Sequence, residues 1–229
     1  MTEDTLAGRL ADIDARVAHA ARAVGRSPAE ITRIVVTKFH PASLVSELHR
    51  LGVRDVGENR QQEFSAKVGD VGPLEGLRWH FVGQAQTKKA RAIRASAAVV
   101  HSVDRAKLAD ALDRAGDGMP PLDVLLQVNL TDDVGRGGVA PDELEGLAEH
   151  VAGCGTLVLR GVMAVAPLGQ EAAPAFDALA GYAERVRRVV PDATWMSAGM
   201  TADFAEAIAA GATHLRIGSA ITGPRPDRG

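Results

Sequence analysis

The chain has 229 residues, of which 46% are hydrophobic, and its 26 lysines and arginines nearly balance 29 aspartates and glutamates, giving a formal net charge of -3. This balance excludes a protein built mainly to grip nucleic acid or an acidic membrane surface, since both favour concentrated positive charge. The single cysteine, Cys154, excludes an internal disulfide framework and a cysteine-rich metal site. Because the amino terminus, MTEDTLAGRL, is acidic and no apolar run reaches membrane-spanning length, we expect a cytoplasmic protein that is not held in a membrane.

The first predicted element is an amphipathic helix that ends near Gly25. Its apolar residues recur at three, four and seven residue steps with charges between them, at Leu6, Leu10, Ile13, Val17 and Val24. After this helix, eight short apolar runs alternate with amphipathic stretches. The runs centre on residues 34–36, 54–56, 80–82, 99–101, 124–128, 160–164, 194–197 and 214–217. Helical patterns between them cover residues 43–51, 87–95, 105–115, 141–151, 175–190 and 202–210.

Strands this apolar, each followed by a helix, are typical of a parallel sheet that is covered on both faces. Eight such units predict an α/β fold, a single (β/α)8 TIM barrel with an extra N-terminal helix. No linker marks a second domain, so we expect one domain over residues 1–229. Because this fold commonly needs about 250 residues, the loops and the last helix must be short. A doubly wound open sheet is the competing architecture, and the weak strand at 53–56 is where the count of eight is least secure.

The active residues of such a barrel lie at the carboxyl ends of its strands. Lys38 alone among the five lysines closes a buried strand, whereas Lys67, Lys88, Lys89 and Lys107 fall in helical patterns where a solvated amine is expected. Burial disfavours a charged ammonium, so this position favours the lowered pKa that a Schiff-base amine requires. The alternative is a lysine whose amine simply extends to solvent at the barrel rim.

A phosphate site is predicted at the loops after strands seven and eight, residues 197–200 and 218–220. Such loops often bind phosphate with backbone amides and a helix amino terminus. Gly199 and Gly218 would let the backbone approach an anion, Ser197 and Ser219 would add hydroxyl donors, and Thr201 would cap the following helix. The alternative is that both glycines are ordinary turn residues.

Arg216 lies two residues before Gly218, so both belong to the same face of the last strand. A guanidinium there needs an acceptor, and an unprotonated ring nitrogen or an ion pair with Glu58 would serve equally. His80 and Asn59 are weaker candidates, because interior histidines and asparagines are most often satisfied core groups. Met163 is expected to be core packing. The histidines form no metal-binding pattern, so no metal site is expected.

Seven ordered sequence blocks carry a family resemblance over nearly the whole chain. They are VVTKFHP from Val35, VGENRQQE from Val56, WHFVGQAQTKK from Trp79, HSVDR from His101, VLLQVNLTDD from Val124, LRGVMAVAP from Leu159 and MSAGMTADFAEAIAAGATHLRIGSAITG from Met196. The sequence resembles the pyridoxal phosphate homeostasis family, whose members look like the barrel domain of alanine racemase.

The resemblance implies that Lys38 holds pyridoxal 5′-phosphate as an internal aldimine and that Arg216 faces the pyridine nitrogen. It also implies that Ser197, Gly199, Gly218 and Ser219 surround the phosphate, with Asn59, His80 and Met163 near the cofactor rings. Two residues depart from the family pattern. Thr222 stands where an aromatic residue is common and Arg136 where a lysine is frequent, which leaves the packing and electrostatics at the pocket mouth open.

A racemase of the related barrel class needs two bases on opposite faces of the cofactor, one of them a tyrosine from a second domain. The only tyrosine here, Tyr182, falls in the helical pattern 175–190. An arginine opposite the ring nitrogen would also keep that nitrogen unprotonated and weaken the cofactor as an electron sink. We therefore expect a monomeric carrier rather than an enzyme, one that acts in cofactor homeostasis and amino-acid or keto-acid balance, with PLP-dependent apoenzymes as recipients. The alternative is a low-activity amino-acid racemase or a Schiff-base aldolase.

Overall fold

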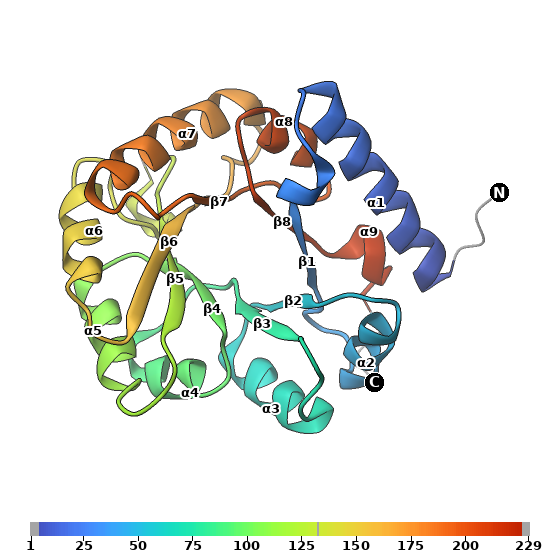
Figure 1. Ribbon diagram of the computed structural model, residues 1–229, viewed down its shortest axis with the longest axis horizontal. Coiled ribbons are helices and arrows are strands. Elements are labelled where there is room, and N and C mark those ends of the chain that lie inside the picture. Colours follow the sequence, from blue (N-terminus) through green and yellow to red (C-terminus); the bar gives the residue numbers. More distant parts are fainter. Residues whose placement is uncertain (1–4, 132, 226–229) are drawn as a thin grey trace.

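The computed structural model describes residues 5–131 and 133–225, and its eight strands close into a barrel in sequence order. Figure 1 shows the strands at the centre, ringed by the helices. The strands are β1 (Thr32–Val36), β2 (Asp55–Glu58), β3 (Arg78–Phe81), β4 (Val99–Val103), β5 (Leu122–Gln127), β6 (Leu157–Met163), β7 (Trp195–Ser197) and β8 (His214–Ile217). The predicted TIM barrel is confirmed.

Barrel closure rests on parallel pairing between the first and last strands. Four residues of β1, from Thr32 to Val35, pair in register with His214 to Ile217 of β8. An open doubly wound sheet would leave these two edges unpaired, so that alternative is excluded. The doubtful second strand also forms, since all four residues of β2 pair with β3.

The helices are α1 (Leu6–Ala23), α2 (Ala42–Arg50), α3 (Gln61–Val71), α4 (Ala90–Arg94), α5 (Ala106–Arg114), α6 (Leu144–Ala152), α7 (Ala172–Val189), α8 (Phe204–Ala209) and α9 (Ser219–Thr222), with short 3-10 turns η1 (Pro28–Glu30), η2 (Thr87–Lys89) and η3 (Val134–Arg136). The expected short last helix is α9. The helix α3 was not among the assigned patterns, because Phe64 and Lys67 are its buried positions and a buried lysine does not read as apolar. Within the described residues, no helix is both long and apolar enough to cross a bilayer.

The N-terminal helix α1 packs against the outside of the barrel beside α8 and α9 (Figure 1). Thr5 caps it, since its Oγ1 accepts the N–H of Gly8 at 3.1 Å. The predicted apolar stripe faces inward at Leu10, Ile13 and Val17, each of which is buried. Helix α1 therefore covers the seam where β8 meets β1.

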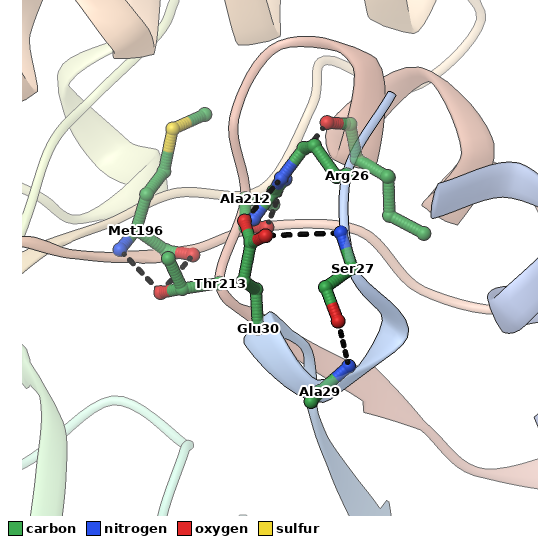
Figure 2. Close-up of polar contacts among 8 residues, drawn as sticks. Arg26, Ser27, Ala29, Glu30, Met196, Ala212 and Thr213 are labelled. Carbon is green, nitrogen blue, oxygen red and sulfur yellow. Dashed lines mark hydrogen bonds and ion pairs between the residues drawn. The ribbon is translucent and has the colours of Figure 1, made fainter. Parts of the chain in front are cut away.

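Side-chain hydrogen bonds reinforce both junctions of β8, with β1 and with β7, at the amino-terminal end of the barrel (Figure 2). Arg26 Nη1 donates to the carbonyl oxygens of Ile208 and Ala212, at 3.0 and 2.8 Å, which ties the segment after α1 to the turn before β8. The strands β7 and β8 share only one ladder pair, Ser197 with His214. Thr213 supplements that ladder, because its Oγ1 accepts the N–H of Met196 at 2.9 Å.

Candidate functional site

A cavity of about 370 Å³ opens at the carboxyl ends of the strands. It lies at the end of a (β/α)8 barrel where active sites are built, and its size is within the range of small-molecule pockets. Its lining consists of Val36, Lys38, Asn59, Val82, Val165, Met200, Thr201, Ala202, Arg216, Gly218 and Ser219. The cavity thus brings together five of the nine predicted site residues, and no carboxylate lines it.

Lys38 lies in a turn directly after β1 and is exposed. The sequence argument that Lys38 is a buried ammonium is therefore wrong, because the strand ends at Val36 and the side chain extends over the cavity rim. The next residue, Phe39, has a φ of 69°, a left-handed conformation that is uncommon outside glycine. The turn that this residue makes directs the chain away from the barrel immediately after Lys38.

The buried lysine is Lys67, which the sequence pattern had assigned to solvent. Its Nζ lies 2.5 Å from Glu58 Oε1 and donates to the carbonyl oxygen of Thr37 at 2.8 Å. Thr37 Oγ1 donates to the same carboxylate oxygen at 2.6 Å. Because these three side chains are at most 7% exposed, they form a buried ion pair that fixes the residue preceding Lys38. Glu58 is thus engaged by Lys67, and the alternative pairing of Glu58 with Arg216 is excluded.

Arg216 is 5% exposed and reaches the cavity from β8. Its Nη1 donates to Ser197 Oγ at 2.6 Å and its Nη2 donates to the carbonyl oxygen of Ala164 at 2.8 Å. Burial lowers the pKa of Arg216 to about 10, so the group remains a cation at neutral pH. A guanidinium has five N–H donors and no acceptor, so donors remain available to a ligand. Any ligand atom that meets them must be an acceptor.

Hydroxyl and backbone groups form the side of the cavity next to Arg216. Thr201 and Ala202 come from the loop after β7, Gly218 directly follows β8, and Ser219 is the first residue of α9. The predicted cap at Thr201 does not form, because α8 begins only at Phe204. Thr201 is instead a lining residue, held in a turn where Asp203 Oδ1 accepts the N–H of Met200 at 2.6 Å.

Gly199 and Ser197 lie outside the cavity lining. Gly199 has a φ of 90°, and a Cβ there would lie 2.7 Å from the Cβ of Ala207 on α8. The fold itself therefore requires this glycine, as the turn interpretation proposed. Ser197 is fully buried on β7, and its hydroxyl meets Arg216 and the Nδ1 of His101 at 2.9 Å.

His80 and Met163 also lie outside the lining, in the barrel interior. His80 is fully buried, and its two ring nitrogens lie 2.9 Å from His101 and from Asp55 at the amino end of β2. Met163 packs with Val99 and Leu125 in a small apolar cluster. The sequence blocks place both residues at strand ends, but they do not tell whether a side chain faces the cavity or the barrel axis.

Six lining residues were missed by sequence reasoning as site residues. They are Val36, Val82, Val165, Met200, Thr201 and Ala202. Thr201 was the one with a usable signal, since it bears a hydroxyl in the same loop as the predicted phosphate site. The aliphatic residues carried no signal, because an apolar residue at a strand end is ordinarily core.

The two departures from the family pattern differ in position. Thr222 is 8% exposed at the end of α9, whereas Arg136 is exposed in η3. Tyr182 lines a different cavity, of about 440 Å³, between the loop after β5 and helix α7.

On the helical surface, Asp110, His150 and Cys154 offer possible metal-ligand atoms within 4.8 Å of one another. The His150 Nε2 hydrogen bond to Asp110 Oδ1, at 2.7 Å, already accounts for that pair.

Comparison with known proteins gives full-length matches. The family model described as alanine racemase, N-terminal domain, matches residues 9–226. The chain is 40% identical over 222 residues to a pyridoxal phosphate homeostasis protein of Pseudomonas aeruginosa, covering 96% of each chain. It is 38% identical over 230 residues to the protein of the same name from Escherichia coli, covering 96% of this chain and 97% of that one. A solved structure of PipY from Synechococcus elongatus, with PLP bound, is 32% identical with a TM-score of 0.85, over 96% of this chain and all of that one.

Proposed function

The chain belongs to the pyridoxal phosphate homeostasis family, within the alanine racemase N-terminal domain group, and we propose that it binds pyridoxal 5′-phosphate at Lys38. One observation carries this proposal. A primary amine, a buried guanidinium and two hydroxyls, from Lys38, Arg216, Thr201 and Ser219, face a single cavity that contains no carboxylate. That donor set suits an anionic ligand that also bears a hydrogen-bond acceptor and an electrophilic carbon.

Different lining residues would bind different parts of the cofactor. When bound, the cofactor supplies an aldehyde that reacts with a primary amine, and Lys38 supplies that amine. Thr201, Ser219 and the backbone of Ala202 and Gly218 would hold its phosphate. A Cβ on Gly218 would lie 3.4 Å from the carbonyl oxygen of Val36, an ordinary contact, so packing within the fold does not by itself require a glycine here. Aliphatic side chains on the other walls would pack against the ring.

Arg216 would hold the ring nitrogen of the bound cofactor by donating to it. Because its guanidinium stays protonated at neutral pH, it disfavours a second positive charge on the ring and keeps the nitrogen unprotonated. An unprotonated ring is a weaker electron sink. Apart from Lys38 and the cationic Arg216, no acidic or basic side chain lines the cavity, and Tyr182 lines another cavity. The protein is therefore a carrier of the cofactor in its homeostasis and in amino-acid or keto-acid balance, not an enzyme with a defined turnover.

We also infer which proteins receive the cofactor and in which compartment the carrier acts. Lys38 is exposed at the barrel rim, so an apoenzyme that receives the cofactor has access to the attachment point. The single cysteine suits the reducing cytoplasm, and we infer that the carrier acts there as a monomer.

The test is the visible absorption of protein mixed with pyridoxal 5′-phosphate. After unbound cofactor is removed by gel filtration, the parent should remain yellow and be bleached by borohydride, and Lys38→Ala should be colourless. Lys107→Ala, which removes an exposed lysine of α5, is the control and should behave as the parent. Turnover of an amino-acid enantiomer at an enzymatic rate would replace the carrier with the racemase alternative. Cleavage of a phosphorylated aldol substrate by cofactor-free protein would favour the aldolase.

A further inference from the structure

A row of hydrogen-bonded side chains crosses the barrel interior from its amino-terminal mouth to the cavity. It consists of Asp55, His80, His101, Ser197 and Arg216, called the polar row below. Successive members lie 2.9, 2.9, 2.9 and 2.6 Å apart. The three central residues are fully buried. Barrel interiors are usually filled with bulky aliphatic side chains, so a polar row of this length calls for a physical reason.

The direction of every hydrogen bond in the row follows from its two ends. The Asp55 carboxylate only accepts, so His80 must carry its proton on Nε2 and donate. His80 Nδ1 then accepts from Nε2 of His101, and His101 Nδ1 accepts from the Ser197 hydroxyl. Ser197 Oγ is left to accept from Arg216, which only donates. In each hydrogen bond, the donor is therefore the residue nearer Arg216 and the acceptor is the residue nearer Asp55. Both histidines are neutral Nε2–H tautomers.

The electrostatic surroundings agree with neutral imidazoles. Burial lowers the pKa of His80 and holds the pKa of His101 well below its usual range. Arg78, Asp123 and His214 are the other charged or titratable groups near the two rings, and burial lowers the pKa of His214 to about 3. Burial raises the pKa of Asp55, but the hydrogen bond from His80 and the neighbouring Arg78 guanidinium outweigh it and leave that pKa lowered. The acceptor that anchors the row is thus ionised at neutral pH.

Arg216 has no carboxylate partner among the ion pairs of the described residues, although it is buried. A row of aligned hydrogen bonds polarises its members, so a carboxylate at one end strengthens the acceptor at the other. We propose that Asp55 is a positioning residue for the cofactor cavity, which holds Arg216 through the aligned hydrogen bonds of His80, His101 and Ser197. The site is thereby organised from the opposite mouth of the barrel. This role deepens the proposed function, since Arg216 is the group that meets the ring nitrogen.

The row also assigns Ser197 a different task from the phosphate contact that the sequence implied. Its hydroxyl donates its one proton to His101 Nδ1 and accepts from Arg216 Nη1. Ser197 therefore has no proton to donate to a ligand. Ser219, which is exposed and lines the cavity, keeps its donor free for that purpose.

The test is nitrogen-15 NMR of the histidine side chains in cofactor-free protein. His80 and His101 should each show a protonated Nε2 and an unprotonated Nδ1 at neutral pH. A protonated Nδ1 on either ring would overturn the proposal. This measurement needs no variant and no cofactor, so a failure of cofactor binding would leave its result unchanged.

Three variants then distinguish an effect of the polar row on cofactor binding from a general loss of stability at the amino-terminal mouth of the barrel. Asp55→Leu removes the acceptor and should give a detectable Nδ1–H population at His101. It should also weaken binding of pyridoxal 5′-phosphate about tenfold, equivalent to about 1.4 kcal/mol. Asp55→Asn keeps an acceptor oxygen at the same place, so it should retain the parent's tautomers and lose less affinity than Asp55→Leu. Asp123→Leu removes a neighbouring carboxylate that bonds Arg160 instead, and should retain both the parent's tautomers and its affinity.

Two outcomes of the variant series would contradict the role of Asp55. One is a set of tautomers in Asp55→Leu that matches the parent. The other is an equal loss of affinity in Asp55→Leu and Asp123→Leu, which would show that only the integrity of the barrel mouth matters. If Asp55→Leu does not fold, the tautomers of the parent still decide the proposal.

Discussion

The buried ion pair beneath Lys38 gives the sharpest prediction about stability. Replacing Lys67 by Met removes a cation that is 7% exposed and leaves the Glu58 carboxylate fully buried, with the Thr37 hydroxyl as its remaining partner. The second oxygen of Glu58 has no hydrogen-bond partner in the described structure. Breaking one side of a buried pair costs about 3–5 kcal/mol. We therefore expect Lys67→Met to lower the free energy of unfolding by about 3–5 kcal/mol, measured by urea denaturation.

The double variant Lys67→Met with Glu58→Gln tests the cause of that loss. Gln is neutral and still accepts from the Thr37 hydroxyl, so the double variant should regain most of the stability, because replacing both charges of a buried pair is often nearly neutral. Asp12→Asn, in a surface pair with Arg16 that is more than half exposed, is the control and should change stability little. The reasoning is refuted if Lys67→Met unfolds at the parent's urea concentration, or if the double variant is no more stable than the single one.

Three further predictions follow from the site and the core. Gly199→Ala should lower the free energy of unfolding by about 1–3 kcal/mol, because it combines a φ of 90° with a Cβ 2.7 Å from Ala207, whereas Gly181→Ala on the exposed side of α7 should raise it by about 0.5–1 kcal/mol. Equal effects of the two glycine substitutions in urea denaturation would contradict this. Ser219→Ala should weaken cofactor binding by about 1.5–3 kcal/mol in equilibrium titration, the worth of a hydrogen bond to a charged group, and an unchanged dissociation constant would remove Ser219 from the phosphate site. Stability should also fall on acidification. His80, His101 and His214 have lowered pKa values in the fold, so the unfolded chain binds protons first below about pH 6.5. Their stabilising effect is complete above that pH and is lost towards pH 3 for His214, by up to about 1.4 kcal/mol per pH unit for each ring. Urea midpoints that stay constant between pH 7 and pH 4.5 would contradict the neutral histidines.

The architecture was predictable because its signal is local. Each strand is a short apolar run, and the parallel barrel follows from their number and from the helical patterns between them. Strand β2 was the weakest prediction, and it forms because the whole of it pairs with β3. Helix α3 was not predicted because its buried face includes Lys67, whose burial depends on the Glu58 carboxylate of the preceding strand β2.

The site was predictable only in part, because a strand end says which residues are near the rim but not which way each side chain turns. Lys38, Asn59, Arg216, Gly218 and Ser219 do line one cavity. His80 and Ser197 occupy the barrel interior instead, where partners on other strands hold them. The choice of Lys38 over Lys67 rested on an expected burial that the structure reverses, so exposure at the rim, next to a cavity, is the better physical reason for it.

The attachment of pyridoxal 5′-phosphate to Lys38 is the central claim, and peptide mass spectrometry tests it most directly. Protein mixed with the cofactor is reduced with borohydride and digested, and the lysine that carries the added mass is identified. We expect a single modified lysine, Lys38, and no modification of the buried Lys67. Modification spread over the exposed Lys88 and Lys107 with Lys38 unmodified, or no modification at all, would contradict it.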